Sequence, residues 1–264
     1  MITIENLSVD YVTDYKNRQR KTVLAGIDLS LPAGTVNVVI GPSGGGKSTL
    51  LKAVAGLVEP ASGSIELTGE GEDRPIIGFM PQSYGLLPWE TIGDNVELAA
   101  RLRLKKGGAS AKDFELMEGQ AHELMKQLGI EAVKDRYPSE VSGGQQQRAA
   151  LARMFLLSPD ILLMDEPFSA LDELTRAEVR EIFADLCIRS RQQEKSAKMT
   201  VLLVTHQIGE AVLLGERIIV LDGRVKEVIE NPRIGLGEGR YSQENAEFPA
   251  RLRELLKREG GASR

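Results

Sequence analysis

Two hydrophobic patterns along the chain predict two kinds of strand. Residues 1–12 alternate between polar and apolar, and the apolar positions are Ile2, Ile4, Leu7 and Val9. Residues 27–31 repeat the alternation, so both segments are predicted to be half-buried antiparallel strands. Four later runs are short and almost continuously apolar, at residues 36–40, 161–165, 201–205 and 218–221. Such runs indicate strands that are covered on both faces in a parallel sheet.

Residues 110–129 have the period of a helix. Apolar side chains recur every three or four positions, at Phe114, Met117, Ala121, Leu124, Met125 and Leu128. Ser110 and Asp113 have the spacing of a capping box at the start of this helix. The stripe predicts a helix that packs on a core. The Gly-rich residues 105–110 before it mark an edge within a helical subdomain that is inserted into the sheet.

Composition favours one large α/β domain, or one core that carries a smaller subdomain. Of the 264 residues, 42% are apolar and 27% are charged, and the net charge of −5 disfavours a large duplex-DNA footprint. The chain has one cysteine, Cys187, and two histidines, so an internal disulfide and a Cys-rich zinc site are not expected. A chain without disulfides is typical of a cytosolic protein. No apolar stretch reaches the roughly 18 residues that span a bilayer, and the first residues do not resemble a secretory signal. We therefore expect another chain to hold the protein at any membrane where it works.

A glycine-rich segment at residues 41–49, GPSGGGKST, satisfies the phosphate-loop pattern between a predicted strand and a helical run. Glycines let the backbone aim successive N–H groups at phosphate oxygens, and the helix adds its positive N-terminus. Lys47 is predicted to reach the β- and γ-phosphates, and Ser48 to ligate Mg²⁺. A chance glycine-rich turn is the alternative, which the context disfavours. The predicted nucleotide-binding residues here are Gly41, Pro42, Ser43, Gly44, Gly45, Gly46, Lys47, Ser48 and Thr49.

An acidic pair ends the apolar run at residues 161–165. Asp165 is placed to hold the hydration shell of Mg²⁺, and Glu166 follows it beyond the strand. A glutamate near a γ-phosphate can orient an attacking water or accept its proton, so Glu166 is the candidate general base. A polar strand end without chemistry is the alternative. With the phosphate loop, the pair distinguishes a motor ATPase from a kinase or a GTPase.

The segment VSGGQQQR at residues 141–148 carries a family resemblance. Together with GPSGGGKST, ILLMDEP, SALD and VTH it resembles the ATP-binding subunit of ABC transporters over about residues 1–225. A lone SGGQ is also an ordinary helix N-cap. Here Ser142 with the amides of Gly143 and Gly144 makes a second anion-binding helix start, with Gln145 beside it.

The resemblance implies a fold and its divisions. The expected fold is α/β, a P-loop NTPase of RecA-like type with a parallel-sheet core, an N-terminal antiparallel β-subdomain and an inserted α-helical subdomain at about residues 84–157. Residues 1–225 are expected to form the ATPase domain. Residues 226–264 are expected to be a C-terminal extension with a short amphipathic helix, which packs on the domain's own surface or, alternatively, lies on anionic lipid.

The resemblance also implies a head-to-tail dimer in which each ATP lies between one phosphate loop and the partner's signature segment. Gln82 resembles the Q-loop glutamine that contacts Mg²⁺ and the attacking water, and His206 the switch histidine that reaches the γ-phosphate. Asp172 resembles the aspartate that helps to couple the two sites. Without the family, Gln82 is read as a surface residue and His206 as structural. Tyr11 is the best match for the aromatic that stacks on adenine. Tyr15 is the alternative, because the basic stretch at 13–22 lengthens this region relative to the family. That stretch is predicted to be a solvated hairpin loop.

A further likeness concerns the transported solute. Residues 84–96, YGLLPWETIGDNV, resemble importer subunits of the nitrate, sulfonate, taurine and bicarbonate group. Trp89 is expected either to anchor the coupling helix of a membrane partner or to close the subdomain's own core. Two positions differ from the residues usual in this group: the signature segment ends in QQQR, and Gln207 follows the switch histidine. Neither difference removes a catalytic atom.

These expectations combine into a peripheral ATPase. It is predicted to lie in the cytoplasm, on the inner face of the cell membrane, through transmembrane permease subunits, and indirectly to serve a solute-binding protein. A nucleic-acid-linked or ribosomal ABC ATPase is the alternative, disfavoured by the single phosphate loop, the single cysteine and the acidic charge. A non-hydrolysing regulatory subunit is disfavoured by the presence of Glu166, Gln82 and His206. A small-molecule P-loop kinase gives no reason for the SGGQ segment.

Overall fold

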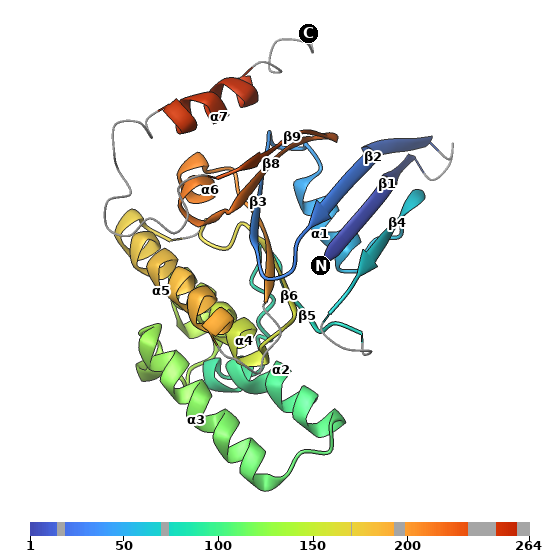
Figure 1. Ribbon diagram of the computed structural model, residues 1–264. Helices are drawn as coiled ribbons and strands as arrows, with labels where there is room; N and C mark the ends of the chain where they lie inside the picture. Colours follow the sequence, from blue (N-terminus) through green and yellow to red (C-terminus); the bar gives the residue numbers. More distant parts are fainter. Residues whose placement is uncertain (15–18, 70–73, 170, 193–198, 232–246, 258–264) are drawn as a thin grey trace. The chain divides into compact units, whose positions relative to one another are not determined.

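The computed structural model describes residues 1–14, 19–69, 74–169, 171–192, 199–231 and 247–257 (Figure 1). The chain divides into two units. The first unit is Met1–Pro75 with Thr200–Arg264, and the second is Ile76–Met199. We describe each unit by itself.

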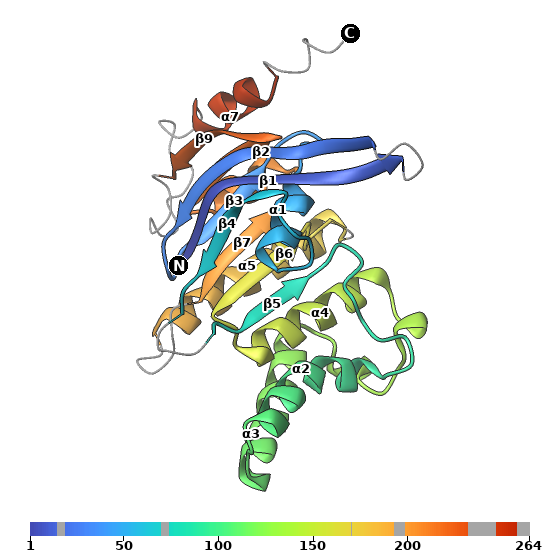
Figure 2. The same ribbon diagram turned by 90° about the vertical axis from the view of Figure 1, so that its right-hand side faces the viewer.

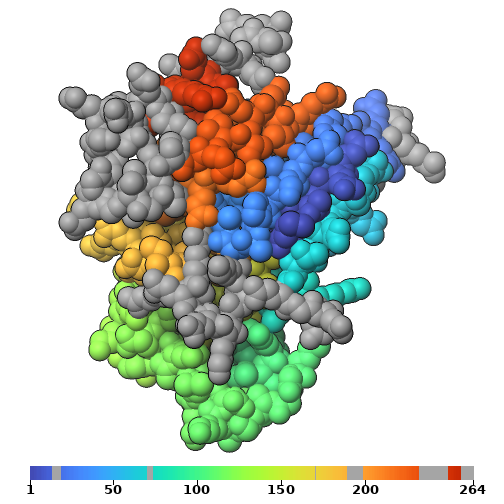
Figure 3. Space-filling model, in the orientation of Figure 1, coloured from blue at the N-terminus to red at the C-terminus, as the bar shows by residue number. Residues whose placement is uncertain are grey.

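The first unit contains an antiparallel sheet with the strand order β2-β1-β4. Its strands are β1 (Ile2–Asp14), β2 (Gln19–Leu31) and β4 (Ser62–Leu67). Ile2 pairs with Leu31 and Ile4 with Leu29, and all four side chains are buried. The two predicted half-buried antiparallel strands are therefore confirmed. In the space-filling view β1, β2 and β4 lie side by side in shades of blue (Figure 3).

A second group of strands in this unit is parallel. β3 (Val36–Ile40) lies between β7 (Thr200–Val204) and β8 (Arg217–Asp222) and pairs with both in parallel. Every residue of β3 and β7 is buried, which confirms the interpretation of the continuous apolar runs. β9 (Arg224–Glu230) adds an antiparallel strand beside β8 and extends past residue 225, so the first part of the expected extension belongs to the sheet.

The described residues of the first unit also form the helices α1 (Lys47–Val54), α6 (Ile208–Leu214) and α7 (Glu247–Lys257). α7 contacts α6, and Leu252 in it is fully buried (Figure 1). The terminal helix thus packs on its own unit, as the sequence pattern favoured over a lipid surface. Tyr15 and part of the basic stretch lie outside the described residues, as does most of the expected extension after β9.

The second unit is mainly helical. β5 (Ile77–Met80) and β6 (Ile161–Asp165) form a parallel pair. α2 (Ile92–Lys106), α3 (Ala111–Gln127) and α4 (Gly143–Leu157) contact one another (Figure 2). Two short 3-10 helices, η1 (Glu131–Val133) and η2 (Pro138–Glu140), precede α4, and α5 (Glu173–Gln192) follows β6.

The predicted stripe on α3 lies against the rest of this unit. Met117, Ala121, Met125 and Leu128 are buried, whereas Phe114 and Leu124 are half-buried. Asp113 accepts a hydrogen bond from the backbone N–H of Ser110 at 2.8 Å, which confirms the capping box. Among the described helices, none is long and apolar enough to cross a membrane.

Candidate functional site

The glycine loop at residues 41–46 joins β3 to α1 in the first unit. Gly44 and Gly46 have φ angles of 80° and 88°, a left-handed conformation that few other residues adopt without cost. A Cβ atom on Gly41 would lie 1.9 Å from the carbonyl oxygen of Leu221, and one on Gly46 would lie 2.5 Å from Cδ2 of Leu24. The chain's own packing therefore requires glycine at both ends of this loop.

Lys47 lies inside the curve of the loop. Its Nζ donates hydrogen bonds to the carbonyl oxygens of Gly41 at 2.9 Å and Pro42 at 2.8 Å, and the residue is only 8% exposed. Pro42, Ser43 and Gly44 are exposed on the outer side of the loop. A fixed ammonium within a loop of backbone N–H groups, at the start of a helix, is suited to binding phosphate.

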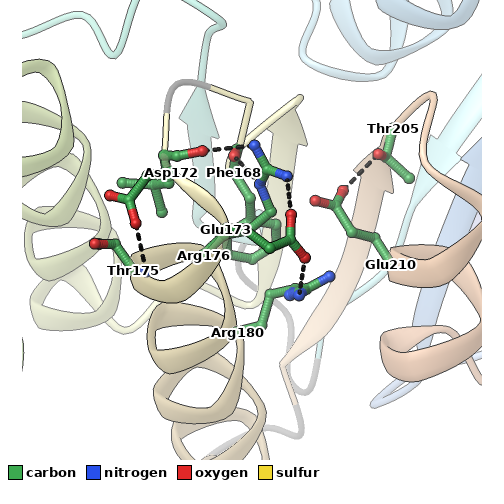
Figure 4. A network of polar contacts seen from close by, with 9 residues as sticks. Phe168, Asp172, Glu173, Thr175, Arg176, Arg180, Thr205 and Glu210 are labelled. Atoms are coloured by element: carbon green, nitrogen blue, oxygen red, sulfur yellow. Dashed lines mark hydrogen bonds and ion pairs between the residues drawn. The ribbon is translucent and has the colours of Figure 1, made fainter.

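The end of β7 carries His206 between two hydrogen-bonded neighbours. Thr205 donates through Oγ1 to Oε2 of Glu210 at 2.5 Å (Figure 4). The Gln207 N–H donates to the same Thr205 oxygen at 3.0 Å. Thr205 and Glu210 are buried, whereas His206 is exposed. These contacts fix the backbone on both sides of the histidine. Sequence reasoning missed Thr205 and Glu210, although a threonine and a glutamate flanking a candidate histidine after a strand were a usable signal.

Tyr11 lies on β1 opposite Lys21 in the antiparallel sheet, and it is 38% exposed. Its ring is therefore accessible to a planar ligand. Its competitor, Tyr15, lies outside the described residues.

The second unit brings Gln82 and Glu166 together. Nε2 of Gln82 donates to Oε2 of Glu166 at 3.3 Å, across 84 positions of the sequence. Glu166 follows the buried Asp165 at the end of β6 and has a left-handed φ of 50°, which is uncommon for a residue with a side chain. Its carbonyl oxygen accepts hydrogen bonds from the N–H and Oγ of Ser169, at 3.2 and 3.0 Å. Such strain persists only where surrounding contacts hold it, and it is typical of functional sites.

The signature segment forms the N-terminus of α4. Oγ of Ser142 accepts from the Gln145 N–H at 3.3 Å, and the Ser142 N–H donates to Oε1 of Gln145 at 3.0 Å. This reciprocal pair is a capping box, so both residues have a local structural role as well. Ser142 and Gly143 are exposed, and a Cβ on Gly143 would meet nothing within 4 Å.

Asp172 caps the helix α5. Its Oδ1 accepts from the Thr175 N–H at 3.1 Å, and the hydrogen bonds from Thr175 lower the pKa of this exposed carboxyl (Figure 4). Arg176 lies one turn further on and donates to the carbonyl oxygens of Phe168 at 3.1 Å and Leu171 at 2.5 Å. The loop before α5 is thereby held from the helix side.

The loop before α2 is held by hydrogen bonds from Asn95 and carries Trp89. The buried Asn95 side chain accepts from the Leu87 N–H at 2.7 Å and donates to the carbonyl oxygens of Leu87, Glu90 and Thr91. This network fixes the loop, yet Trp89 on it is 68% exposed. The alternative in which Trp89 closes the subdomain's core is wrong, because its side chain is exposed.

Mg²⁺ suits the donors that this chain offers. Within the described ranges, no group of three or more His, Cys, Asp or Glu side chains could hold a metal ion alone. Mg²⁺ is usually bound through one or two carboxylates together with substrate phosphates, so it does not require such a group of side chains.

Comparison with known proteins identifies the family. Residues 24–169 match the family model described as ABC transporter. The chain belongs to the ABC transporter family. An aliphatic sulfonates import ATP-binding protein of Mesorhizobium japonicum is 41% identical over 80% of this chain and 75% of its own length. A taurine import ATP-binding protein of Escherichia coli is 38% identical over 86% of this chain and 83% of its own.

Solved structures agree with the sequence comparison. One similar structure is the dimeric post-hydrolysis state of the ATP-binding cassette MJ0796, bound to ADP and Pi. Its sequence is 32% identical to this chain, the TM-score is 0.72, and the alignment covers 87% of this chain and 98% of that one. The expected fold class, that of a P-loop NTPase cassette, is confirmed. The enzyme class of ABC-type ATPases is confirmed as well.

Proposed function

We propose that this chain is the ATP-hydrolysing subunit of an importer for small sulfonate- or taurine-like anions. The ATPase part of the proposal rests on the contact between Gln82 and Glu166. This contact places the Gln82 amide beside the carboxylate that is the candidate general base. The import part rests on the sulfonate and taurine import proteins named above. These relatives give no support to the nucleic-acid alternative.

Roles for the site residues follow from their chemistry. The loop from Gly41 to Thr49 binds the phosphates through backbone N–H groups, with Lys47 as the point charge. Glu166 orients the attacking water and accepts its proton, and Gln82 and His206 position the water and the γ-phosphate. Ser48, Gln82 and Asp165 would hold Mg²⁺, which would neutralise developing charge on the phosphates. Tyr11 stacks on adenine.

Hydrolysis requires two copies of the chain in this proposal. Ser142, Gly143, Gly144 and Gln145 of one copy close over the nucleotide in the phosphate loop of the other, and Asp172 helps to couple the two sites. The dimeric cassette structure supports this arrangement, as does the open, exposed backbone at Gly143. ATP adds phosphate contacts that ADP lacks, so the closed dimer forms with ATP and opens after hydrolysis.

Glu166→Gln tests the proposal. The amide keeps the size of the side chain but cannot accept a proton, so we expect ATP binding to persist and turnover to fall about 10²- to 10⁴-fold. The variant should elute as a dimer in size-exclusion chromatography with MgATP and as a monomer with MgADP. A variant that binds ATP yet stays monomeric at high concentration would contradict the two-copy site.

Transmembrane permease subunits are the proposed second partner, and they hold the chain on the cytoplasmic face of the membrane. Trp89 is exposed on a loop that Asn95 fixes, which is the presentation expected of an interface anchor. The second unit also has a surface groove of 380 Å³, whose lining includes the apolar residues Phe79, Pro81, Leu98, Met154 and Leu157. A solute-binding protein delivers the anion to the permease and does not touch this chain.

A further inference from the structure

A buried arginine on α4 holds the turn that follows Gln82. Nη1 of Arg153 donates to the carbonyl oxygen of Gly85 at 2.8 Å, and Nη2 donates to that of Tyr84 at 2.7 Å. Arg153 is 7% exposed and reaches these acceptors across 68 and 69 positions of the sequence. A planar guanidinium suits such a two-point contact, whereas a lysine ammonium is a single point charge.

The turn needs an external restraint. Tyr84 and Gly85 have φ angles of 65° and 61°, so two successive residues are left-handed and one of them has a side chain. Within the turn, the Tyr84 N–H donates to Pro81 O at 2.9 Å and the Gly85 N–H to Ser83 O at 2.8 Å. An L-residue in this conformation persists only where its surroundings hold it. The two carbonyl oxygens that Arg153 binds belong to the two left-handed residues.

The arginine has no competing anionic partner in the part of the chain that the structure describes. It forms no ion pair there, and its hydrogen bonds go to the two turn carbonyls. Burial lowers the pKa of the Arg153 guanidinium, which remains charged because that pKa starts far above neutrality. A buried guanidinium that is hydrogen-bonded only to neutral carbonyl oxygens destabilises the fold unless both hydrogen bonds are kept.

We propose that Arg153 is a positioning residue for Gln82, because it fixes the turn at residues 81–85 from which the Gln82 amide reaches Glu166. This inference rests on the proposed catalytic role of Gln82. Gln82 itself is exposed, and its 3.3 Å bond to Glu166 is long, so that contact cannot hold the turn by itself. The restraint comes instead from α4, the helix that carries Arg153.

Hydrogen exchange of the full-length protein without nucleotide tests the restraint itself. In Arg153→Met we expect the amides of residues 82–88 to exchange at least about tenfold faster, since two charge-assisted bonds are lost. Arg153→Lys should give a smaller increase and serves if the methionine variant does not fold. Arg148→Met is the matched control, because Arg148 lies on the same helix but donates to Leu128 O at 3.1 Å. Unchanged exchange at residues 82–88 in both Arg153 variants would overturn the proposal.

Steady-state kinetics test the link to Gln82. Arg153→Met should lower kcat for ATP about tenfold or more, because small misplacements of a positioning group are costly, and should leave KM within about twofold. In a Gln82→Ala background the same substitution should lower kcat no further. An equal loss in both backgrounds would mean a general structural role and would overturn the proposal.

Failure of the proposed function gives a different result. If Gln82→Ala leaves kcat unchanged while exchange at residues 82–88 still rises in Arg153→Met, the catalytic role of Gln82 is wrong and Arg153 still holds the turn. If Gln82→Ala lowers kcat and Arg153→Met changes neither exchange nor kcat, the catalytic role stands and Arg153 does not position it.

Discussion

The two glycine-rich segments of this chain need their glycines for different reasons. In the loop at residues 41–46, a Cβ on Gly41 or Gly46 would overlap atoms of the same chain, at 1.9 and 2.5 Å. In the signature segment, a Cβ on Gly143 would meet nothing within 4 Å, and one on Gly144 would meet the flexible end of Leu171 at 3.1 Å and Oγ of Ser142 at 4.0 Å. The first segment is shaped by internal packing. The second leaves open space at the exposed Gly143, as expected of a surface that another molecule approaches.

The largest effect should come from Gly41→Ala. The new methyl group would collide with a backbone carbonyl, which cannot rotate away, so we expect the free energy of unfolding to fall by about 3 kcal/mol or more. Gly44→Ala is the control, because its left-handed φ is strained but the space beside it is open, and about 1 kcal/mol is expected. Urea denaturation measures both. Equal losses would show that close approach at Gly41 is not what makes glycine necessary.

Lys47→Ala should impair binding rather than folding of the phosphate loop. Removing a charged donor is expected to weaken ATP affinity by about 2–3 kcal/mol, close to a hundredfold. Isothermal titration with MgATP gives the affinity, and Lys47→Arg tests whether a charge alone suffices. Retained affinity with lost turnover would instead place the lysine only in the hydrolysis step.

Gly143→Ala should separate activity from stability. Because the site is open, the free energy of unfolding should change by no more than about 0.5 kcal/mol. A methyl group between the signature backbone and a partner's nucleotide should lower ATPase activity about tenfold, a cost of about 1.4 kcal/mol. Chemical denaturation and phosphate release are measured on the same preparation. Full activity in this variant would contradict the two-copy site.

Ser142→Ala should have a smaller effect than Gly41→Ala or Lys47→Ala. Loss of the N-cap is expected to cost about 1 kcal/mol of stability, and Ser142→Thr should restore most of it because threonine also caps helices. If the serine hydroxyl also binds phosphate, the alanine variant loses ATPase activity beyond what Gly143→Ala loses. Thermal unfolding and phosphate release distinguish the two roles.

Much of the fold was predictable because burial leaves a periodic trace. The runs at residues 36–40 and 161–165 became β3 and β6 with the predicted bounds, and the α3 stripe and its capping box were found in place. The short strands β4 and β5 and the strand β9 were not predicted. Each has exposed or half-buried positions, so polar residues and glycines interrupt the signal.

Short motifs were enough to propose residues for the candidate site but not the contacts that support them. The phosphate loop, Asp165, Glu166, Ser142 and the other family positions were proposed in this way, and their roles stay predictions. Arg153 could not be proposed in this way, because an arginine in an Ala- and Leu-rich helix gives no sign that its guanidinium binds carbonyls 68 positions earlier. Thr205 and Glu210 differ from Arg153 because they lie five positions apart on either side of His206, so their place in the sequence was a signal, although only the structure shows that both are buried and hydrogen-bonded.

The sequence by itself determined which segments become buried strands and amphipathic helices, and it placed the motifs that we propose to bind phosphate and activate water. Those properties depend on residues close together in the chain, where period and spacing are fixed by backbone geometry. Only the tertiary structure decided that Trp89 is exposed, that Gln82 meets Glu166 and that Arg153 binds the two carbonyl oxygens of the turn after Gln82. Such contacts join residues far apart in sequence, and whether a polar group is buried or exposed depends on the partner that folding brings to it.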